Sequence, residues 1–171
     1  MRIYIVGPGG SGKSTLAKRL GSHFNIPVIH LDELQWKPEW IENKEYRNLQ
    51  NQAILQDNWI IEGSSVSILK TMKDCVDVVI ILNHSPVGNI FRIFKRYLKG
   101  IFFQEKRIGW AMENIHGLRA DFLFNTLRWG TRQLPRIRAN IKEYSLEGKV
   151  IELQSLENIF ERIVNKLKYI T

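Results

Sequence analysis

The chain has 171 residues, of which 44% are hydrophobic, so it suits a single domain with a substantial buried core. Its one cysteine, Cys75, excludes an internal disulfide, and no apolar run approaches membrane-spanning length. The formal net charge of +8 points to a polyanionic partner, either a nucleotide or a nucleic acid. From these features we expect a cytoplasmic protein of one domain, residues 1–171, with no membrane partner.

Short apolar runs alternate with stretches of helical periodicity along most of the chain. Such alternation predicts an α/β fold, in which helices cover both faces of a parallel sheet and all strands end at one edge. Ligands of sheets of this kind bind at that edge. Five runs have the composition of buried strands: residues 3–6, 27–31, 58–63, 77–82 and 148–153. Helices are expected over about 13–24, 44–56, 65–72, 86–98, 135–144 and 156–167.

Two parts of the chain lack a clear period. Residues 35–40 are predicted to be irregular, and residues 100–130 mix aromatic residues with arginines. Within the second segment, 111–118 and 120–128 could be helical. The positive charge is concentrated around it, because residues 90–140 hold eleven Lys and Arg against three Asp and Glu. That surplus equals the net charge of the whole chain, and a long irregular segment in a compact domain is often a mobile lid.

The segment between the first strand and the first helix matches G-x-x-x-x-G-K-[ST], the pattern of a phosphate-binding P-loop. Its glycines permit positive φ and close approach, so backbone N–H groups can surround phosphate oxygens beside the positive end of the helix. Lys13 is expected to reach the β- and γ-phosphates of ATP, and the Ser14 hydroxyl is expected to bind Mg²⁺. The alternative, a glycine-rich turn that binds nothing, does not explain the flanking strand and helix. The residues predicted to bind ATP are Gly7, Pro8, Gly9, Gly10, Ser11, Gly12, Lys13, Ser14 and Thr15.

Two acidic residues follow other predicted strands. Glu62 ends the third strand and could hold Mg²⁺ through water, the alternative being an exposed loop carboxylate. Asp32 follows the second strand and could accept a proton from an acceptor hydroxyl or hydrogen-bond the acceptor, the alternative being a helix N-cap. Because Gly7, Asp32, Glu62 and His84 all follow strands, we expect them to converge at one edge of the sheet.

Arginines after the fourth strand suggest contacts to nucleotide and phosphate. Arg92 and Arg96 lie four residues apart on one face of the predicted helix, where they could contact the base and the phosphates. A solvated basic face is the alternative. An arginine of the lid could also neutralise the transferred phosphoryl group, and spacing does not choose among the four candidates. These are Arg107, Arg119, Arg128 and Arg132.

Other aromatic and imidazole side chains allow weaker predictions. Trp36 and Trp40 closely follow Asp32, and either an acceptor pocket or the core could contain them. The four histidines have no metal-ligand spacing, so we interpret them as structural.

Three stretches together resemble a bacterial P-loop family known as DNA topology modulation protein or adenylate-kinase-like protein. They are the P-loop, His30-Leu31-Asp32 followed by Trp36 and Trp40, and Trp59-Ile60-Ile61-Glu62-Gly63. The resemblance extends over nearly the whole chain, and H-L-D-x-L-x-W-x-P-x-W is its most specific part. It implies a three-layer α/β/α P-loop NTPase fold with a five-stranded parallel sheet in the order 2-3-1-4-5. It also implies a helical, arginine-rich lid over about residues 100–133.

The same resemblance implies roles for single residues. Residues 90–96 are similar to the helix that enters the lid of adenylate kinases, where the first arginine packs on adenine and the second contacts phosphate. The loop near Gln154 and Ser155 would border the adenine. Glu62 replaces the Asp of those kinases and has a longer arm, and their R-x-D lid signature followed by Gly-Cys is missing between Arg107 and Arg119.

Our first hypothesis is an ATP-dependent kinase that transfers the γ-phosphate to a small acceptor, which could be a nucleoside monophosphate, a nucleoside or another hydroxylated metabolite. The alternative is an ATP-dependent nucleic-acid-binding regulator, although the chain has no helix-turn-helix or zinc-finger pattern. The expected oligomeric state is a monomer or a homodimer. The residues predicted to be catalytic are Lys13, Asp32, Arg96, Arg128 and Arg132, the nucleotide ligands are residues 7–15 with Arg92, and the metal ligands are Ser14 and Glu62.

Overall fold

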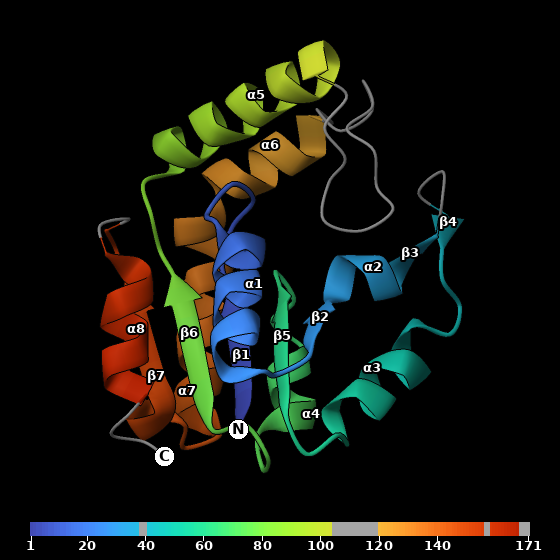
Figure 1. Ribbon diagram of the computed structural model, residues 1–171, viewed down its shortest axis with the longest axis vertical. Coiled ribbons are helices and arrows are strands. Elements are labelled where there is room, and N and C mark those ends of the chain that lie inside the picture. The colour runs from blue at the N-terminus through green and yellow to red at the C-terminus, as the bar shows by residue number, and fades with distance from the viewer. Residues whose placement is uncertain (38–40, 104–119, 156–157, 168–171) are drawn as a thin grey trace.

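The computed structural model describes residues 1–37, 41–103, 120–155 and 158–167. Five strands form the main sheet (Figure 1): β1 Arg2–Val6, β2 Val28–His30, β5 Trp59–Gly63, β6 Val78–Leu82 and β7 Val150–Leu153. The α-helices are α1 Lys13–Phe24, α2 Leu31–Gln35, α3 Tyr46–Ile54, α4 Ile68–Met72, α5 Pro86–Phe103, α6 Ala120–Leu127, α7 Leu134–Glu143 and α8 Ile159–Leu167. A π-helix joins α6 to α7 at Trp129–Gln133, and a 3₁₀ turn at Glu147–Lys149 precedes β7.

The five long strands are all parallel, in the order β2-β5-β1-β6-β7. Counted among these five strands alone, that order is 2-3-1-4-5, so the expected topology is confirmed. The three central strands have almost no exposed surface, which explains their continuous runs of branched apolar residues. All five carboxyl ends lie at one edge, where the loop after β1 leads into α1 (Figure 1).

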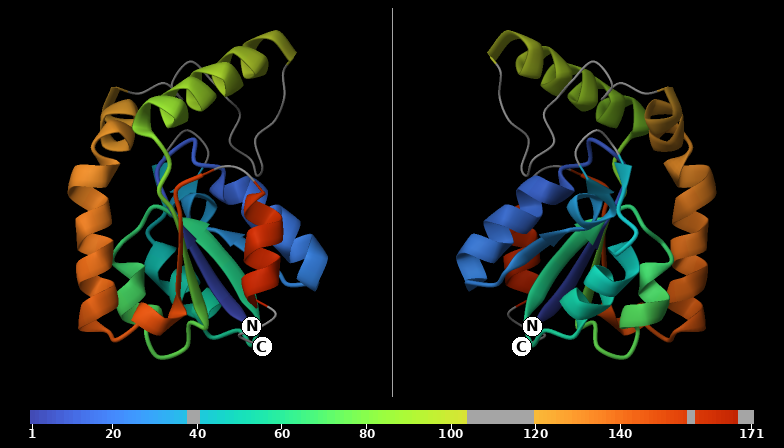
Figure 2. Two further views of the ribbon diagram at one scale, coloured as in Figure 1. Left: turned by 90° about the vertical axis from the view of Figure 1, so that its left-hand side faces the viewer. Right: turned by 90° about the vertical axis from the view of Figure 1, so that its right-hand side faces the viewer.

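Helices cover both faces of the sheet, so the molecule has three layers (Figure 2). Successive strand residues point to opposite faces, and in β6 Ile80 packs with α1 and α8 whereas Ile81 packs with the helices of the other side. That second core combines residues of α3, α4 and α7 with Trp129. No helix among the described residues is long and apolar enough to cross a membrane.

The structure corrects the sequence prediction in two places. Residues 35–40 were expected to be irregular, but α2 follows β2 directly, and β3 Trp36–Lys37 pairs antiparallel with β4 Ile41–Glu42. Strands of two residues carry too little pattern to be detected in a sequence. The helix expected over about 86–98 continues to Phe103 as α5. The possible helix over 120–128 is confirmed as α6, and the one over 111–118 lies outside the described residues.

Two helices extend over the edge at which the strands end. Figure 1 shows α5 crossing above the loop between β1 and α1, with α6 beneath α5. Both helices contact this loop, because Gly9 lies against α6 and Gly10 lies against α5. Together with the π-helix they occupy the described part of the predicted lid, about residues 100–133.

Candidate functional site

The loop from Gly7 to Gly12 joins β1 to α1 through two left-handed glycines, Gly10 at φ 70° and Gly12 at φ 90°. Gly12 is the N-cap of α1 and brings no side-chain hydrogen bond, so the first N–H groups of the helix have no side-chain cap. The first turn of α1 also has no acidic residue. A loop of this kind at a helix N-terminus is an anion-binding site.

Lys13 folds back over this loop. Its side chain is 9% exposed, and its Nζ donates a hydrogen bond to the carbonyl oxygen of Pro8 at 2.9 Å. The Ser11 hydroxyl is fully buried in the same loop and has no hydrogen-bond partner among the described residues. The loop thus gathers an ammonium group and an unsatisfied buried hydroxyl.

Glu62, at the end of β5, reaches the start of α1. It is 5% exposed, and its Oε1 accepts hydrogen bonds from Ser14 Oγ at 2.9 Å and from His30 Nδ1 at 2.7 Å. Burial alone would raise the pKa of this carboxyl, but the His30 and Ser14 hydrogen bonds and the Lys13 charge together hold its pKa below the usual value. Glu62 is therefore an ionised, buried carboxylate and not an exposed loop residue.

The residue predicted to meet an acceptor, Asp32, lies on α2, next to α3. Asp32 is exposed in the first turn of α2, whose N-cap is His30, so Asp32 is not the N-cap. Tyr46 begins α3 and is half-buried, and its pKa is raised first by burial and then by the negative charge of Asp32. Glu33 Oε1 is buried without a hydrogen-bond partner in the part of the chain that the structure describes. Trp36 is half-buried beyond α2, and Trp40 lies outside the described residues.

Of the arginines, Arg92 contacts the P-loop directly. Its Nε donates to the carbonyl oxygen of Gly10 at 2.7 Å, and its Nη2 donates to the side-chain oxygen of Asn89. Arg96 is half-buried one turn further along α5. Arg128 is exposed and places its guanidinium 3.9 Å from the centre of the Phe124 ring, and Arg132 is exposed in the π-helix. The other two candidates, at positions 107 and 119, lie outside the described residues.

Gly9 and Gly10 show how closely the two upper helices approach the loop. A Cβ on Gly9 would lie 2.4 Å from the Phe122 ring of α6, and a Cβ on Gly10 would lie 2.4 Å from the Asn89 backbone of α5. Gly10 also needs glycine for its positive φ, whereas Gly9 needs it only for the close approach. The predicted phosphate loop is therefore in direct contact with α5 and α6.

No protein-family model matches the chain, and no curated protein matches it. Shikimate kinase from Bacteroides thetaiotaomicron superposes with a TM-score of 0.56 and 18% identity, over 99% of this chain and 97% of that one. Deoxyadenosine kinase from M. mycoides, in a structure with the products dCMP and dCDP, gives 0.57 and 17%, over 100% of both chains. The chain has the P-loop kinase fold. At these identities the likeness concerns the fold alone. It does not support the resemblance to DNA topology modulation proteins.

P-loop kinases generally use ATP and Mg²⁺, and the residues present fit both. The uncapped start of α1, the Lys13 ammonium and the orphaned Ser11 hydroxyl suit a polyphosphate. Ser14 Oγ and the Glu62 carboxylate are hard oxygen donors, as Mg²⁺ requires. The described residues contain no cluster of three His, Cys, Asp or Glu that could hold a metal. Mg²⁺ in proteins usually keeps several waters and binds through one or two carboxylates and the phosphates of its substrate.

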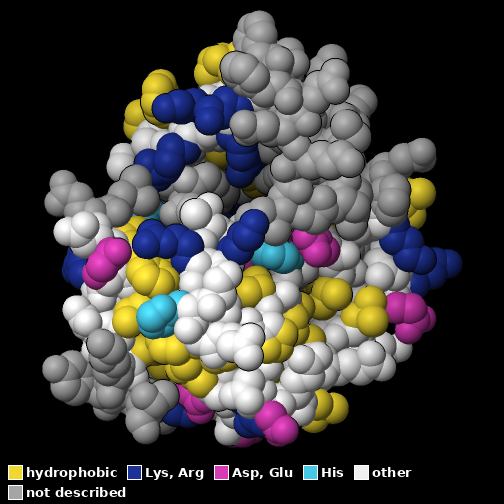
Figure 3. Space-filling model, viewed as in Figure 1, with side chains coloured by type: hydrophobic (Ala, Val, Ile, Leu, Met, Phe, Trp, Pro, Cys, Tyr) yellow, Lys and Arg dark blue, Asp and Glu magenta, His cyan; other side chains and the backbone are white. Residues whose placement is uncertain are grey.

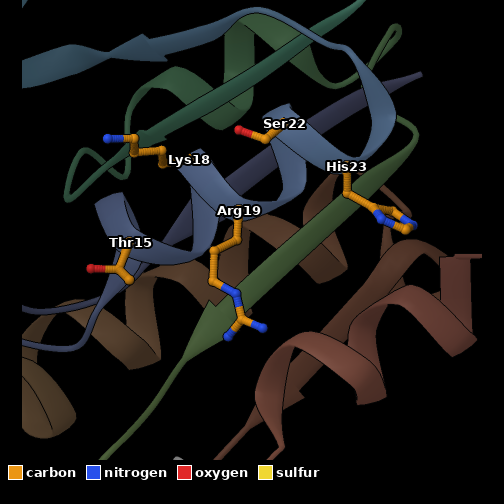
Figure 4. A pocket seen from close by; sticks show the side chains of 5 residues that line it. All are labelled: Thr15, Lys18, Arg19, Ser22 and His23. Carbon is orange, nitrogen blue, oxygen red and sulfur yellow. The ribbon is translucent and has the colours of Figure 1, made fainter.

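Positive charge lies above and beside the phosphate loop. Figure 3 shows Lys and Arg side chains gathered in the upper part of the molecule, over α5 and the start of α1. A hollow of about 490 Å³ also runs along the outer face of α1 (Figure 4), lined by Thr15, Lys18, Arg19, Ser22 and His23. Arg19 is held there, 4.2 Å from the centre of the Phe160 ring and 3.5 Å from Glu161. Thr15, predicted as a nucleotide ligand, is exposed at this hollow.

Sequence reasoning missed three residues of the site. His30 was interpreted as structural, but it hydrogen-bonds the predicted metal ligand Glu62. Asn89 is a fully buried amide in α5, and Phe122 covers Gly9 from α6. The signal that could have indicated His30 is its position at the end of the second strand. In the parallel register of the adjacent β5, His30 lies opposite Glu62, one residue before that strand ends.

Proposed function

We propose that the protein is a kinase that transfers the γ-phosphate of ATP to a hydroxyl group of a small acceptor. The observation that carries this proposal is the 2.9 Å hydrogen bond between Ser14 Oγ and Glu62 Oε1 beside Lys13. It gathers the two expected metal ligands and the phosphate-binding lysine in one buried group at the carboxyl edge of the sheet. The P-loop kinase fold supports the same reaction class.

Each residue of this group has a definite task. Lys13 exchanges the Pro8 carbonyl for phosphate oxygens when a nucleotide enters the loop. Ser14 donates its hydroxyl proton to Glu62, which would leave the lone pairs of the Ser14 oxygen available to Mg²⁺. Bound Mg²⁺ would neutralise charge on the β- and γ-phosphates. Arg96, Arg128 and Arg132 remain our candidates for contacts to the transferred group, and closure of the lid would bring the two exposed arginines to it.

The acceptor side favours an uncharged hydroxyl compound. Asp32 is exposed to receive the hydroxyl proton, and Glu33 has a buried carboxylate oxygen without a donor. Asp32, Glu33 and Glu62 make this side negative, since all three act to raise the pKa of His30. An acceptor phosphate or carboxylate would be repelled there. We therefore favour nucleosides and sugars over nucleoside monophosphates.

The test is ADP release from ATP and Mg²⁺ with a panel of nucleosides, sugars, nucleoside monophosphates and hydroxy acids. One of the uncharged compounds should accelerate turnover, and Lys13→Ala should lower it by at least about 100-fold. Lys18→Ala, on the exposed side of the same helix, is the control and should keep the activity. If no acceptor accelerates turnover, the proposal of a kinase is contradicted. If only phosphorylated acceptors accelerate it, the proposed preference for uncharged acceptors is contradicted.

A second candidate function is binding of single-stranded nucleic acid along α5. This helix has no acidic residue and exposes Phe91 and Phe94, at 67% and 50%, beside Lys95 and Lys99. Aromatic platforms with basic neighbours suit single strands. Binding that survives physiological salt would support this function, and a collapse of affinity with added salt would reduce it to unspecific charge attraction.

A further inference from the structure

His30 and Glu62 form a cross-strand pair. β2 and β5 are neighbouring parallel strands in which His30 lies opposite Glu62, so their side chains stand on the same face of the sheet. That face is the one that α1 covers. The His30 side chain is 13% exposed and the Glu62 side chain 6%, so water has little access to the 2.7 Å contact between them.

The direction of this hydrogen bond follows from the second bond to the same oxygen. Glu62 Oε1 accepts from the Ser14 hydroxyl, and a carboxylate oxygen without a proton can only accept. His30 must then donate through Nδ1–H. Ser14 donates to the same oxygen, so both bonds converge on Oε1 and neither involves Oε2.

Two converging donors fix a carboxylate that one donor would leave free to turn. A Glu side chain has one more rotatable bond than Asp. Each freely rotating bond lowers the fraction of time that the carboxylate spends in the orientation suited to binding metal. With Ser14 alone, the carboxylate could turn about the single hydrogen bond at Oε1. With His30 as a second donor from another element, turning the carboxylate would strain one of the two hydrogen bonds at Oε1.

We propose that His30 is a positioning residue for magnesium binding: its hydrogen bond orients the Glu62 carboxylate, which would bind Mg²⁺ together with Ser14. This inference rests on the proposed use of ATP with Mg²⁺, and is independent of the acceptor. Partners that orient a metal-binding side chain typically change metal affinity by about 10–100-fold when removed.

The experiment measures ATP binding by calorimetry over a series of Mg²⁺ concentrations, and in EDTA, without any acceptor. His30→Leu should raise the Mg²⁺ concentration for half-maximal effect by about 10–100-fold and leave binding in EDTA within about twofold. His30→Asn places an amide N–H where Nδ1 was and should stay near wild type. His30→Gln moves that donor further out and should resemble His30→Leu. His23→Leu, at an exposed histidine of α1, is the matched control.

A purely structural histidine would give a different pattern. Equal loss of binding in EDTA and in Mg²⁺, or identical Mg²⁺ dependence of His30→Leu and wild type, would overturn the inference. So would His30→Asn and His30→Gln behaving alike. If His30→Leu does not fold, as judged by circular dichroism, the Asn and Gln variants decide the question. In a Glu62→Gln background, His30→Leu should add no further Mg²⁺ effect. Failure of the proposed function is separate, because it would appear as turnover that no acceptor accelerates, whereas the Mg²⁺ dependence of ATP binding is measured without an acceptor.

Discussion

Arg92 Nε on α5 donates a hydrogen bond to the carbonyl oxygen of Gly10 in the P-loop, across 2.7 Å. The adenine contact expected for this arginine stays a prediction, but in the structure Arg92 links a helix to the loop. Hydrogen bonds from charged donors contribute about 1.5–3 kcal/mol each. Arg92→Ala should therefore lower the free energy of unfolding by about 1.5–2 kcal/mol, the lower part of that range because Arg92 is partly exposed.

Urea denaturation measures this change. Lys95→Ala, on the exposed side of the same helix, is the control and should stay within about 0.5 kcal/mol of wild type. If both variants lose the same stability, the hydrogen bond to Gly10 does not hold α5.

Gly9→Ala tests the contact between the loop and α6. The added Cβ would meet the Phe122 ring at 2.4 Å, so the Phe122 side chain or α6 must shift, at a cost of about 1–3 kcal/mol in the free energy of unfolding. The double variant Gly9→Ala with Phe122→Ala removes the clash and should recover part of the loss. Gly148→Ala, where the new Cβ meets nothing within 4 Å, is the control. Additive effects of the two changes in thermal denaturation would contradict this contact.

Acid should destabilise the protein through His84. This side chain is 4% exposed, and its pKa is lowered chiefly by burial and further by the nearby Arg92 charge, which together outweigh the raising effect of the Gln154 backbone. The unfolded chain therefore binds the proton more readily, so the His84 contribution is fully present above about pH 6.5 and is lost as pH falls below it.

The measurement compares unfolding free energies of wild type and His84→Asn at pH 7.5 and 5.5. His30 titrates with the opposite sign, because its pKa is raised chiefly by the Glu62 hydrogen bond. The difference between wild type and the variant isolates His84 and should shrink on acidification. A difference that stays constant or grows would show that His84 is not held neutral.

Asp32→Asn separates transfer from nucleotide binding. If Asp32 takes the acceptor proton, kcat should fall by about 10²–10⁴-fold while ATP binding stays unchanged. Asp57→Asn, an exposed carboxylate after α3, is the control and should leave kcat unchanged. Equal kcat in Asp32→Asn and wild type would remove Asp32 from the catalytic group.

The sheet could be predicted because its strands are short, branched and apolar, and the P-loop because its residues are contiguous. Glu62 was found because parallel strands end together. The contacts that the sequence did not reveal depend on how separate elements meet. The spacing of residues places Arg92 on one face of a helix. It does not indicate that this face is turned towards Gly10. Likewise, no spacing indicates that Arg128 covers Phe124, or that His30 is close enough to hydrogen-bond Glu62.

The contacts of Gly9 with α6 and of Gly10 with α5 have a thermodynamic consequence. A ligand that shifts this loop changes the free energy of both helices, and by linkage anything that moves the helices changes the affinity of the loop by the same factor. Substitutions in the buried face of α6, far along the chain from residues 7–15, would thus act as modulators of nucleotide affinity without touching the nucleotide. Thr126 is 2% exposed, and its hydroxyl oxygen would lie 2.9 Å from a Cβ on Gly9. A substitution of Thr126 should therefore show this coupling between α6 and the loop most directly.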